Sequence, residues 1–124
     1  MLRFYLFDDA IKSIPDTKMV LYLCENQGWE RGFLYCWKKY NKGSSIAIAH
    51  STIRYWDLRY CDDLRNFGST DLFRQPMPDY FAVNGSLAKK VYMEANQRIK
   101  TLIDVEALRY LHLSKNISIP KKSN

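Results

Sequence analysis

The chain has 124 residues, a length typical of one domain, and carries a formal net charge of +6. Its sequence contains neither the roughly 18 consecutive apolar residues of a membrane-spanning helix nor a block of like charges. Because the apolar stretch at the N-terminus is too short for a signal peptide, we expect a single domain over residues 1–124, a cytoplasmic location and no membrane contact.

The first fifty residues are rich in aromatic and β-branched side chains bounded by turn residues, a pattern typical of strands. The short turns between these segments predict that the strands pair in an antiparallel meander. The expected strands are Leu2–Phe7, Lys18–Cys24, Gly32–Tyr40 and Ser45–Ala49.

The segment from Thr52 to Phe67 can be interpreted in two ways. As a helix it places Ile53, Trp56 and Tyr60 on one stripe, with Gly68 as its stop. As a strand it would place a charged residue among the aromatic side chains of one face. We favour the helix because more apolar positions match its period.

Extended backbone is expected around the prolines at 76 and 78, and then a short strand over Asp79–Val83. Ser86 is the predicted N-cap of a helix whose apolar stripe continues to Leu102. An unbroken helix to residue 113 would be too long for such a domain, so we expect a break near Asp104 and a second helix over Val105–Leu113. Residues 115–124 read as a frayed basic tail. The predicted fold class is therefore α+β, an antiparallel sheet of about four strands with C-terminal helices on one face.

Residues that could support catalysis or bind metal are few. The cysteines Cys24, Cys36 and Cys61 and the histidines His50 and His112 show none of the close spacings of zinc sites. We therefore predict no metal, no cofactor and no catalytic residue, and we favour a protein that is not an enzyme. A dispersed site remains open: a pocket that held either histidine beside a carboxylate or a thiol would revive an enzymatic function.

Arginine and aromatic residues alternate in the segment 53–65, the least ordinary stretch of the chain. Arginine binds phosphate and stacks on rings, and aromatic side chains stack on exposed bases. The alternative is that the aromatic residues belong to the core and the arginines pair with neighbouring aspartates. The predicted partner- or phosphate-binding residues are Arg54, Tyr55, Arg59, Arg65, Arg74, Lys38, Lys39, Lys89 and Lys90.

The surplus of positive charge and of aromatic residues (15% of the chain) predicts an acidic partner. Our leading interpretation is a small non-enzymatic binding protein that contacts an acidic protein surface or nucleic acid. An inhibitor of nucleic-acid machinery, such as a phage-borne anti-defence protein, would have these features. The alternatives are direct binding of nucleic acid or a nucleotide, and an enzyme with a dispersed site.

Overall fold

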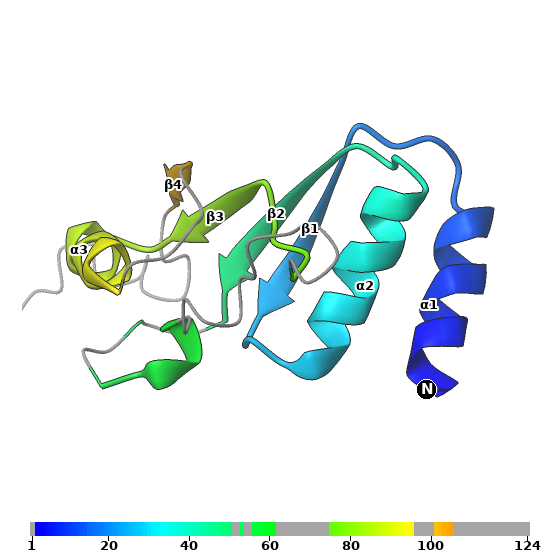
Figure 1. Cartoon of the computed structure of the whole chain (residues 1–124). Helices are drawn as coiled ribbons and strands as arrows, with labels where there is room; N and C mark the ends of the chain where they lie inside the picture. The colour runs from blue at the N-terminus through cyan, green and yellow to red at the C-terminus, as the bar shows by residue number, and fades with distance from the viewer. Residues whose placement is uncertain (1, 51–52, 54–55, 62–74, 96–100, 106–124) are drawn as a thin grey trace, which may run out of the picture.

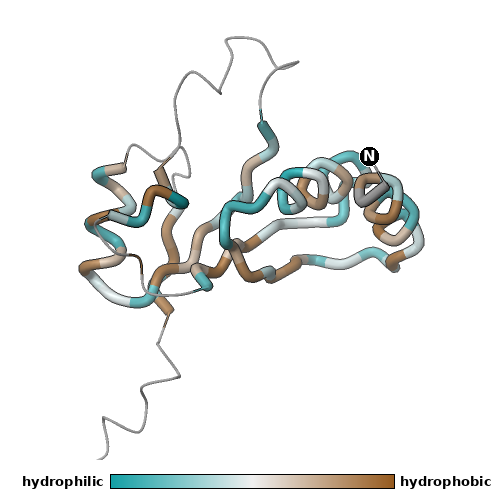
Figure 2. Tube along the Cα trace, turned by 90° about the horizontal axis from the view of Figure 1, so that it is seen from below, coloured by the Kyte–Doolittle hydropathy of each residue, from teal (hydrophilic) through white to brown (hydrophobic). Residues whose placement is uncertain are grey.

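The computed structural model describes residues 2–50, 53, 56–61, 75–95 and 101–105. Four strands form one sheet in the order β1-β2-β3-β4, and every neighbouring pair is parallel. The elements are α1 (Leu2–Ser13), β1 (Met19–Cys24), α2 (Gly28–Lys39), β2 (Ser44–Ala49), the 3₁₀ turn η1 (Leu58–Tyr60), β3 (Tyr80–Val83), α3 (Ser86–Glu94) and β4 (Leu102–Asp104). In Figures 1 and 2, α1 and α2 lie side by side at one end of the sheet and α3 lies at the other.

The parallel sheet shows that the predicted antiparallel meander is wrong. Two of the expected strands, Leu2–Phe7 and Gly32–Tyr40, belong to helices α1 and α2. Because α2 connects β1 to β2, the two strands run in the same direction, as in other strand–helix–strand units. The strands predicted at 18–24, 45–49 and 79–83 correspond to β1, β2 and β3.

Apolar positions with a helical period explain why the two misassigned segments are helices. In α1, Phe7 and Ile11 lie four residues apart, and both belong to a small core with Trp37. In α2, the buried residues Glu30, Leu34 and Trp37 follow a spacing of four and three. The aromatic and β-branched side chains that predicted strands are therefore arranged on helices, where the buried positions recur every three or four residues.

The predictions for the later helices are corrected in three places. The expected helix over 52–67 is only the single turn η1 within the described residues, and neither Ile53 nor Trp56 is helical. Helix α3 begins at Ser86 with Gly85 as its N-cap, and it ends at Glu94. Leu102, which we expected on the apolar stripe of this helix, lies instead in strand β4 and pairs with Phe81. Residues 106–113 and the predicted tail at 115–124 lie outside the described residues.

The crossover helices α2 and α3 contact the same face of the sheet. Tyr22, Ala47 and Phe81 lie side by side in register across β1, β2 and β3, so their side chains point to one side. The Phe33 ring of α2 lies 5.5 Å from the Tyr22 ring, and the Tyr92 ring of α3 stacks on Phe81 at 4.3 Å. Strands added in one direction through right-handed crossovers place their helices on one face, which accounts for this arrangement.

The opposite face of the sheet is apolar and partly open. Met19, Leu21 and Leu23 alternate along the edge strand β1 and are all more than half exposed. Their neighbours in β2, Ile46 and Ile48, are partly buried. Strand β1 is therefore apolar on both faces, as is usual for parallel strands.

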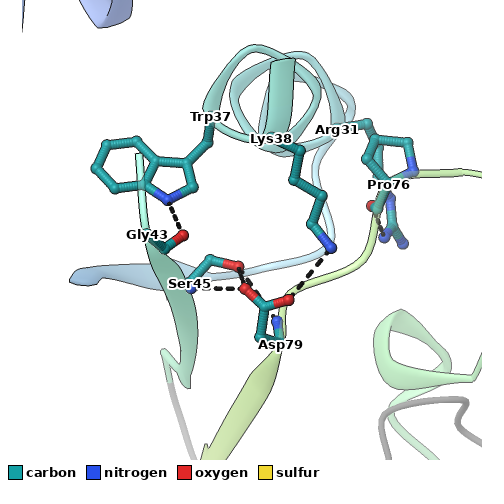
Figure 3. A network of polar contacts seen from close by, with 7 residues as sticks. All are labelled: Arg31, Trp37, Lys38, Gly43, Ser45, Pro76 and Asp79. Atoms are coloured by element: carbon teal, nitrogen blue, oxygen red, sulfur yellow. Dashed lines mark hydrogen bonds and ion pairs between the residues drawn. The ribbon is translucent and has the colours of Figure 1, made fainter. Parts of the chain in front are cut away.

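A polar network fixes the segment that leads into β3 (Figure 3). Asp79 Oδ2 accepts hydrogen bonds from the backbone N–H and the hydroxyl of Ser45, each at 2.8 Å. Lys38 of α2 lies 3.4 Å from the other carboxylate oxygen, and Arg31 donates to the Pro76 carbonyl. Helix α2 thereby holds residues 76–79 at two points along its length, which positions β3 beside β2.

Candidate ligand site at the carboxyl edge of the sheet

The predicted basic residues that the structure describes do not form one surface. Lys38 and Lys39 lie at the end of α2, beside the amino ends of the strands, whereas Arg59 lies beside the loop that follows β1. Lys89 lies in the first half of α3, beside the end of β4. Arg54, Tyr55, Arg65 and Arg74 lie outside the described residues.

Each of the predicted basic residues that the structure describes has a carboxylate partner. Arg59 donates through Nε and Nη2 to both oxygens of Asp57, and these hydrogen bonds raise the pKa of Arg59. The ion pairs of the lysines are Lys38–Asp79 at 3.4 Å, Lys39–Asp8 at 2.7 Å, Lys89–Asp104 at 2.8 Å and Lys90–Glu94 at 3.9 Å. The pairing of Arg59 with Asp57 is the one that the alternative interpretation of the 53–65 segment described for its arginines.

Arg31 and Arg59 line a hollow of about 310 Å³ that is open to solvent. Arg31 Nη2 donates to Asn26 Oδ1 at 2.6 Å, and Asn26 Nδ2 donates to the Arg59 carbonyl at 2.5 Å. The buried Tyr60 donates its hydroxyl hydrogen to the Cys24 carbonyl at 3.1 Å. These contacts join the loop after β1 to η1, so the polar groups of the hollow serve to hold three segments together.

The residues that follow the strands form a row at the carboxyl edge. Since Cys24 pairs with Ala49, the next residues, Glu25 and His50, lie opposite each other. His50 Nδ1 lies 3.0 Å from Glu25 Oε1, and the His50 backbone N–H donates to the Cys24 carbonyl. Both side chains are partly exposed. Extending the β2–β3 register by two residues places Asn84 next in this row.

The N-terminus of α2, which opens onto this edge, is filled by the protein's own carboxylate. Glu30 is 2% exposed, and its Oε1 accepts hydrogen bonds from the backbone N–H groups of Glu25 and Gln27. Its Oε2 accepts from the Cys24 thiol at 3.2 Å. Glu30 completes a capping box with Gln27, so a negative charge already occupies the position that an anion would take.

The N-terminus of α3 opens onto the same edge and differs from that of α2. Its N-cap is Gly85, which has a φ of 100°, and no side chain among the described residues caps the helix. Its first turn contains no acidic residue. The Oδ1 atom of the preceding Asn84 is buried, and no described residue donates a hydrogen bond to it. The first turn of a helix presents backbone N–H groups that the helix itself cannot satisfy, so this end can accept an anion.

The cysteines do not supply a nucleophile in the core. Burial raises the pKa of Cys24 to about 12, and burial also raises the pKa of Cys36. The third thiol, Cys61, is exposed. Within the residues that the structure describes, no three His, Cys, Asp or Glu side chains are grouped so that they could hold a metal ion.

The sequence-based prediction missed most residues of this edge. Asn26, Glu30, Asn84 and Gly85 lie in segments that the sequence indicated as turns, and Glu25 was not singled out. The signal in the sequence is the position of these residues directly after apolar runs. This position indicates a shared edge of the sheet only once the strands are known to be parallel.

Comparisons with known proteins found no matching family model, no similar curated protein and no similar solved structure. In the parts of the chain that the structure describes, no helix is both long enough and apolar enough to cross a membrane.

Proposed function

We propose that the protein binds a small phosphate-bearing ligand, such as a nucleotide, with a phosphate group at the N-terminus of α3. The observation that carries the proposal is the uncapped N-terminus of this helix at the carboxyl edge of a parallel sheet. In open parallel sheets of this kind, ligands bind beyond the carboxyl ends of the strands.

The contrast between the two helices supports the choice of α3 over α2. Both follow a strand, and both begin at the same edge of the sheet. Glu30 neutralises the positive end of α2, while α3 begins with the sequence Asn84-Gly85-Ser86, in which no carboxylate is present. Apart from the adjoining Asn84 and Ser86, no described residue has an atom within 4 Å of the position of a Cβ at Gly85, which leaves open space beside the loop.

One side chain beside the loop adds suitable chemistry. Lys89 Nζ lies 2.8 Å from Asp104, and an ammonium group has three donors, so Lys89 can keep this contact and also donate to a phosphate oxygen.

A pair of matched substitutions tests the proposal. Ser86→Asp places a carboxylate at the first position of α3, and Gly28→Asp places one at the first position of α2, where the site is already filled. Titration of pyrophosphate and of a nucleoside diphosphate, followed by calorimetry and by amide chemical shifts, should show weaker binding by at least about tenfold for Ser86→Asp. Gly28→Asp should bind within about twofold of the wild type.

Equal loss of affinity in both variants, or no binding by the wild-type protein, would overturn the proposal. A single-stranded oligonucleotide serves as a second probe in the same assay. If it binds more tightly than the diphosphate, with an affinity that falls steeply as salt is added, the ligand is nucleic acid rather than a free nucleotide.

A second candidate function, contact with a protein partner, is favoured by the exposed residues where η1 begins. Trp56 is 84% exposed and Leu58 is 74% exposed, and tryptophan is enriched among the residues that dominate interface energies. This candidate corresponds to our leading interpretation of the sequence, a small binding protein. It assigns the contact with the partner to Trp56 and Leu58, which adjoin Arg59 in the chain. Trp56→Ala should then abolish retention of a protein partner from nuclease-treated extract, and salt should weaken retention only slightly. Leu87→Ala, which truncates another exposed apolar side chain, is the control and should not change retention.

A further inference from the structure

We propose that the open face of the sheet binds a second copy of this chain, with β1 of one copy lying antiparallel across β1 of the other. The proposal goes beyond the phosphate site of α3 and does not depend on it. The open face consists of the side chains that lie in register on one side of the four strands: Met19, Leu21, Leu23, Ser44, Ile46, Ile48, Tyr80, Ala82 and Ile103.

All three helices that the structure describes lie on the other side of the sheet. Ile11 of α1 and Trp37 of α2 pack with Val20, which points to the opposite side of β1 from Leu21. Helix α3 packs on the same side as Val20 through Tyr92. Because parallel sheets are almost always covered on both faces, the open face lacks the second layer that such a sheet normally has.

Exposure on the open face is greatest along β1. Met19, Leu21 and Leu23 are 53%, 57% and 58% exposed, whereas Ile48 of β2 is partly buried and Ala82 of β3 is 2% exposed. A two-fold axis at Leu21 places Met19 of one copy against Leu23 of the other, and Leu21 against Leu21. The three exposed side chains of each copy then leave water together, which favours association.

The distribution of charge favours a second copy over an acidic partner. In the described residues the open face carries no charged side chain, so it offers nothing to a phosphate backbone or to an acidic protein surface. Lys18 precedes β1 and Glu25 follows it, and both are accessible to solvent. In the antiparallel arrangement the Lys18 end of one copy meets the Glu25 end of the other, so two contacts between opposite charges form by symmetry.

The size of the open face determines how tight the contact can be. Strands rise about 3.3 Å per residue and lie about 4.8 Å apart, so the face over β1 to β3 spans at most about 20 by about 15 Å, or about 300 Å². A stable interface buries about 800 Å² of each partner. We therefore expect a reversible dimer with a Kd of about 10–100 µM rather than a permanent one.

Sedimentation velocity of the full chain tests the proposal. Between about 5 and about 500 µM the wild type should change from monomer to dimer. Leu21→Glu places a charge at the centre of the contact and should weaken dimerisation by at least about tenfold. Leu6→Glu is the matched control: it changes a leucine of α1 that is 61% exposed, and it should dimerise within about twofold of the wild type.

Leu21→Gln provides the same comparison if circular dichroism shows that Leu21→Glu does not fold. A wild type that stays monomeric over the whole range would overturn the proposal. Dimerisation of a folded Leu21 variant as tight as that of the wild type would also overturn it.

Exchange of the charges at the ends of β1 tests the antiparallel arrangement. Lys18→Glu should weaken dimerisation by about three- to tenfold because it brings like charges together, and the addition of Glu25→Lys should restore it. A double variant as weak as the single one would overturn this arrangement. If the Leu21 and Leu23 methyl groups were protected from a soluble paramagnetic agent at every protein concentration, another part of the chain, such as residues 106–124, would cover the face. That result would overturn the second copy as its occupant.

Discussion

Asp79 and Ser45 are joined by four hydrogen bonds at the start of β2 and β3. Asp79 Oδ2 accepts from the backbone N–H and the hydroxyl of Ser45, and the Asp79 N–H donates to the Ser45 carbonyl at 3.0 Å and to the Ser45 hydroxyl oxygen at 3.2 Å. Ser45 is completely buried. The contact sets where β3 begins against β2, and it links two segments that are 34 residues apart.

Asp79→Ala should therefore destabilise the fold more than the loss of an exposed ion pair would. It leaves a buried N–H and a buried hydroxyl without their acceptor, which costs about 2–4 kcal/mol in the free energy of unfolding. Urea denaturation followed by tryptophan fluorescence measures the change. Glu94→Ala, which breaks the exposed Lys90–Glu94 pair, should cost less than about 0.5 kcal/mol. A cost for Asp79→Ala as small as that of the control would contradict the structural role.

The same carboxylate makes stability depend on pH. Burial alone would raise the pKa of Asp79, but the hydrogen bonds from Ser45 and the charge of Lys38 outweigh it and lower the pKa below its ordinary value. The native state thus binds fewer protons than the unfolded state, and the stabilisation is complete above the unfolded pKa of about 3.9. It is lost as the pH falls below about 4. Asp79→Asn should flatten this part of the stability profile, measured by urea denaturation from about pH 6 downwards.

Which elements the sequence could predict depends on how they bury their side chains. The runs of β1, β2 and β3 are apolar on both faces, and such runs bounded by turn residues are recognisable as strands. Helices α1 and α2 were mistaken for strands because their aromatic residues have high β-propensity, and Gly28 and Gly32 resemble turns. In the structure Gly32 lies inside α2 and faces Phe4 and Phe7 of α1. The parallel pairing could not be predicted once α2 had been assigned as a strand.

The short strand β4 and the edge residues were hidden for a related reason. Leu102 continues the apolar spacing of α3, and only its pairing with Phe81 makes it part of a strand. Glu25, His50 and Asn84 are far apart in the chain, and parallel pairing brings their positions into one row. Long-range pairing of this kind leaves no local pattern in a single sequence.

Glu30 should be the most sensitive charged position of α2. Glu30→Ala removes the acceptor of two backbone N–H groups and of the Cys24 thiol in a site that is 2% exposed. The expected loss is about 2–4 kcal/mol, from the lost cap and the unpaired buried donors. Glu30→Gln keeps an acceptor and should lose about 1–2 kcal/mol. Thermal and urea denaturation measure both changes, and a fully stable Glu30→Ala would show that the capping box does not stabilise the helix.

The three thiols should differ in reactivity. Burial raises the pKa of Cys24 to about 12, so this residue has almost no thiolate at neutral pH, while Cys61 is exposed. Iodoacetamide at pH 8 should therefore alkylate Cys61 first in the folded protein, as measured by peptide mass spectrometry. All three should react in denaturant. Equal labelling of Cys24 and Cys61 without denaturant would contradict the burial of Cys24.

Gly43 should be the least replaceable of the described glycines. Its φ is 95°, and a Cβ there would lie 2.5 Å from the backbone carbonyl oxygens of both Thr17 and Lys18. These carbonyls belong to the segment that enters β1, and Ser44 N donates to the Lys18 carbonyl as β2 begins. Gly43→Ala must therefore displace backbone as well as adopt an unfavourable conformation, at a cost of about 2–4 kcal/mol.

Two other glycines separate these contributions. Gly85 has a φ of 100°, but apart from its chain neighbours no described residue has an atom within 4 Å of its Cβ position, so Gly85→Ala should cost only the conformational part, about 1–2 kcal/mol. Gly28 has neither constraint and opens α2, so Gly28→Ala should be neutral or slightly stabilising. Urea denaturation of the three alanine variants should rank their stabilities Gly28, Gly85 and Gly43, from the most to the least stable. If Gly43→Ala lost no more stability than Gly85→Ala, the backbone of residues 17–18 would not lie as close to Gly43 as the structure shows. The contact between the segments that lead into β1 and β2 would then also be wrong.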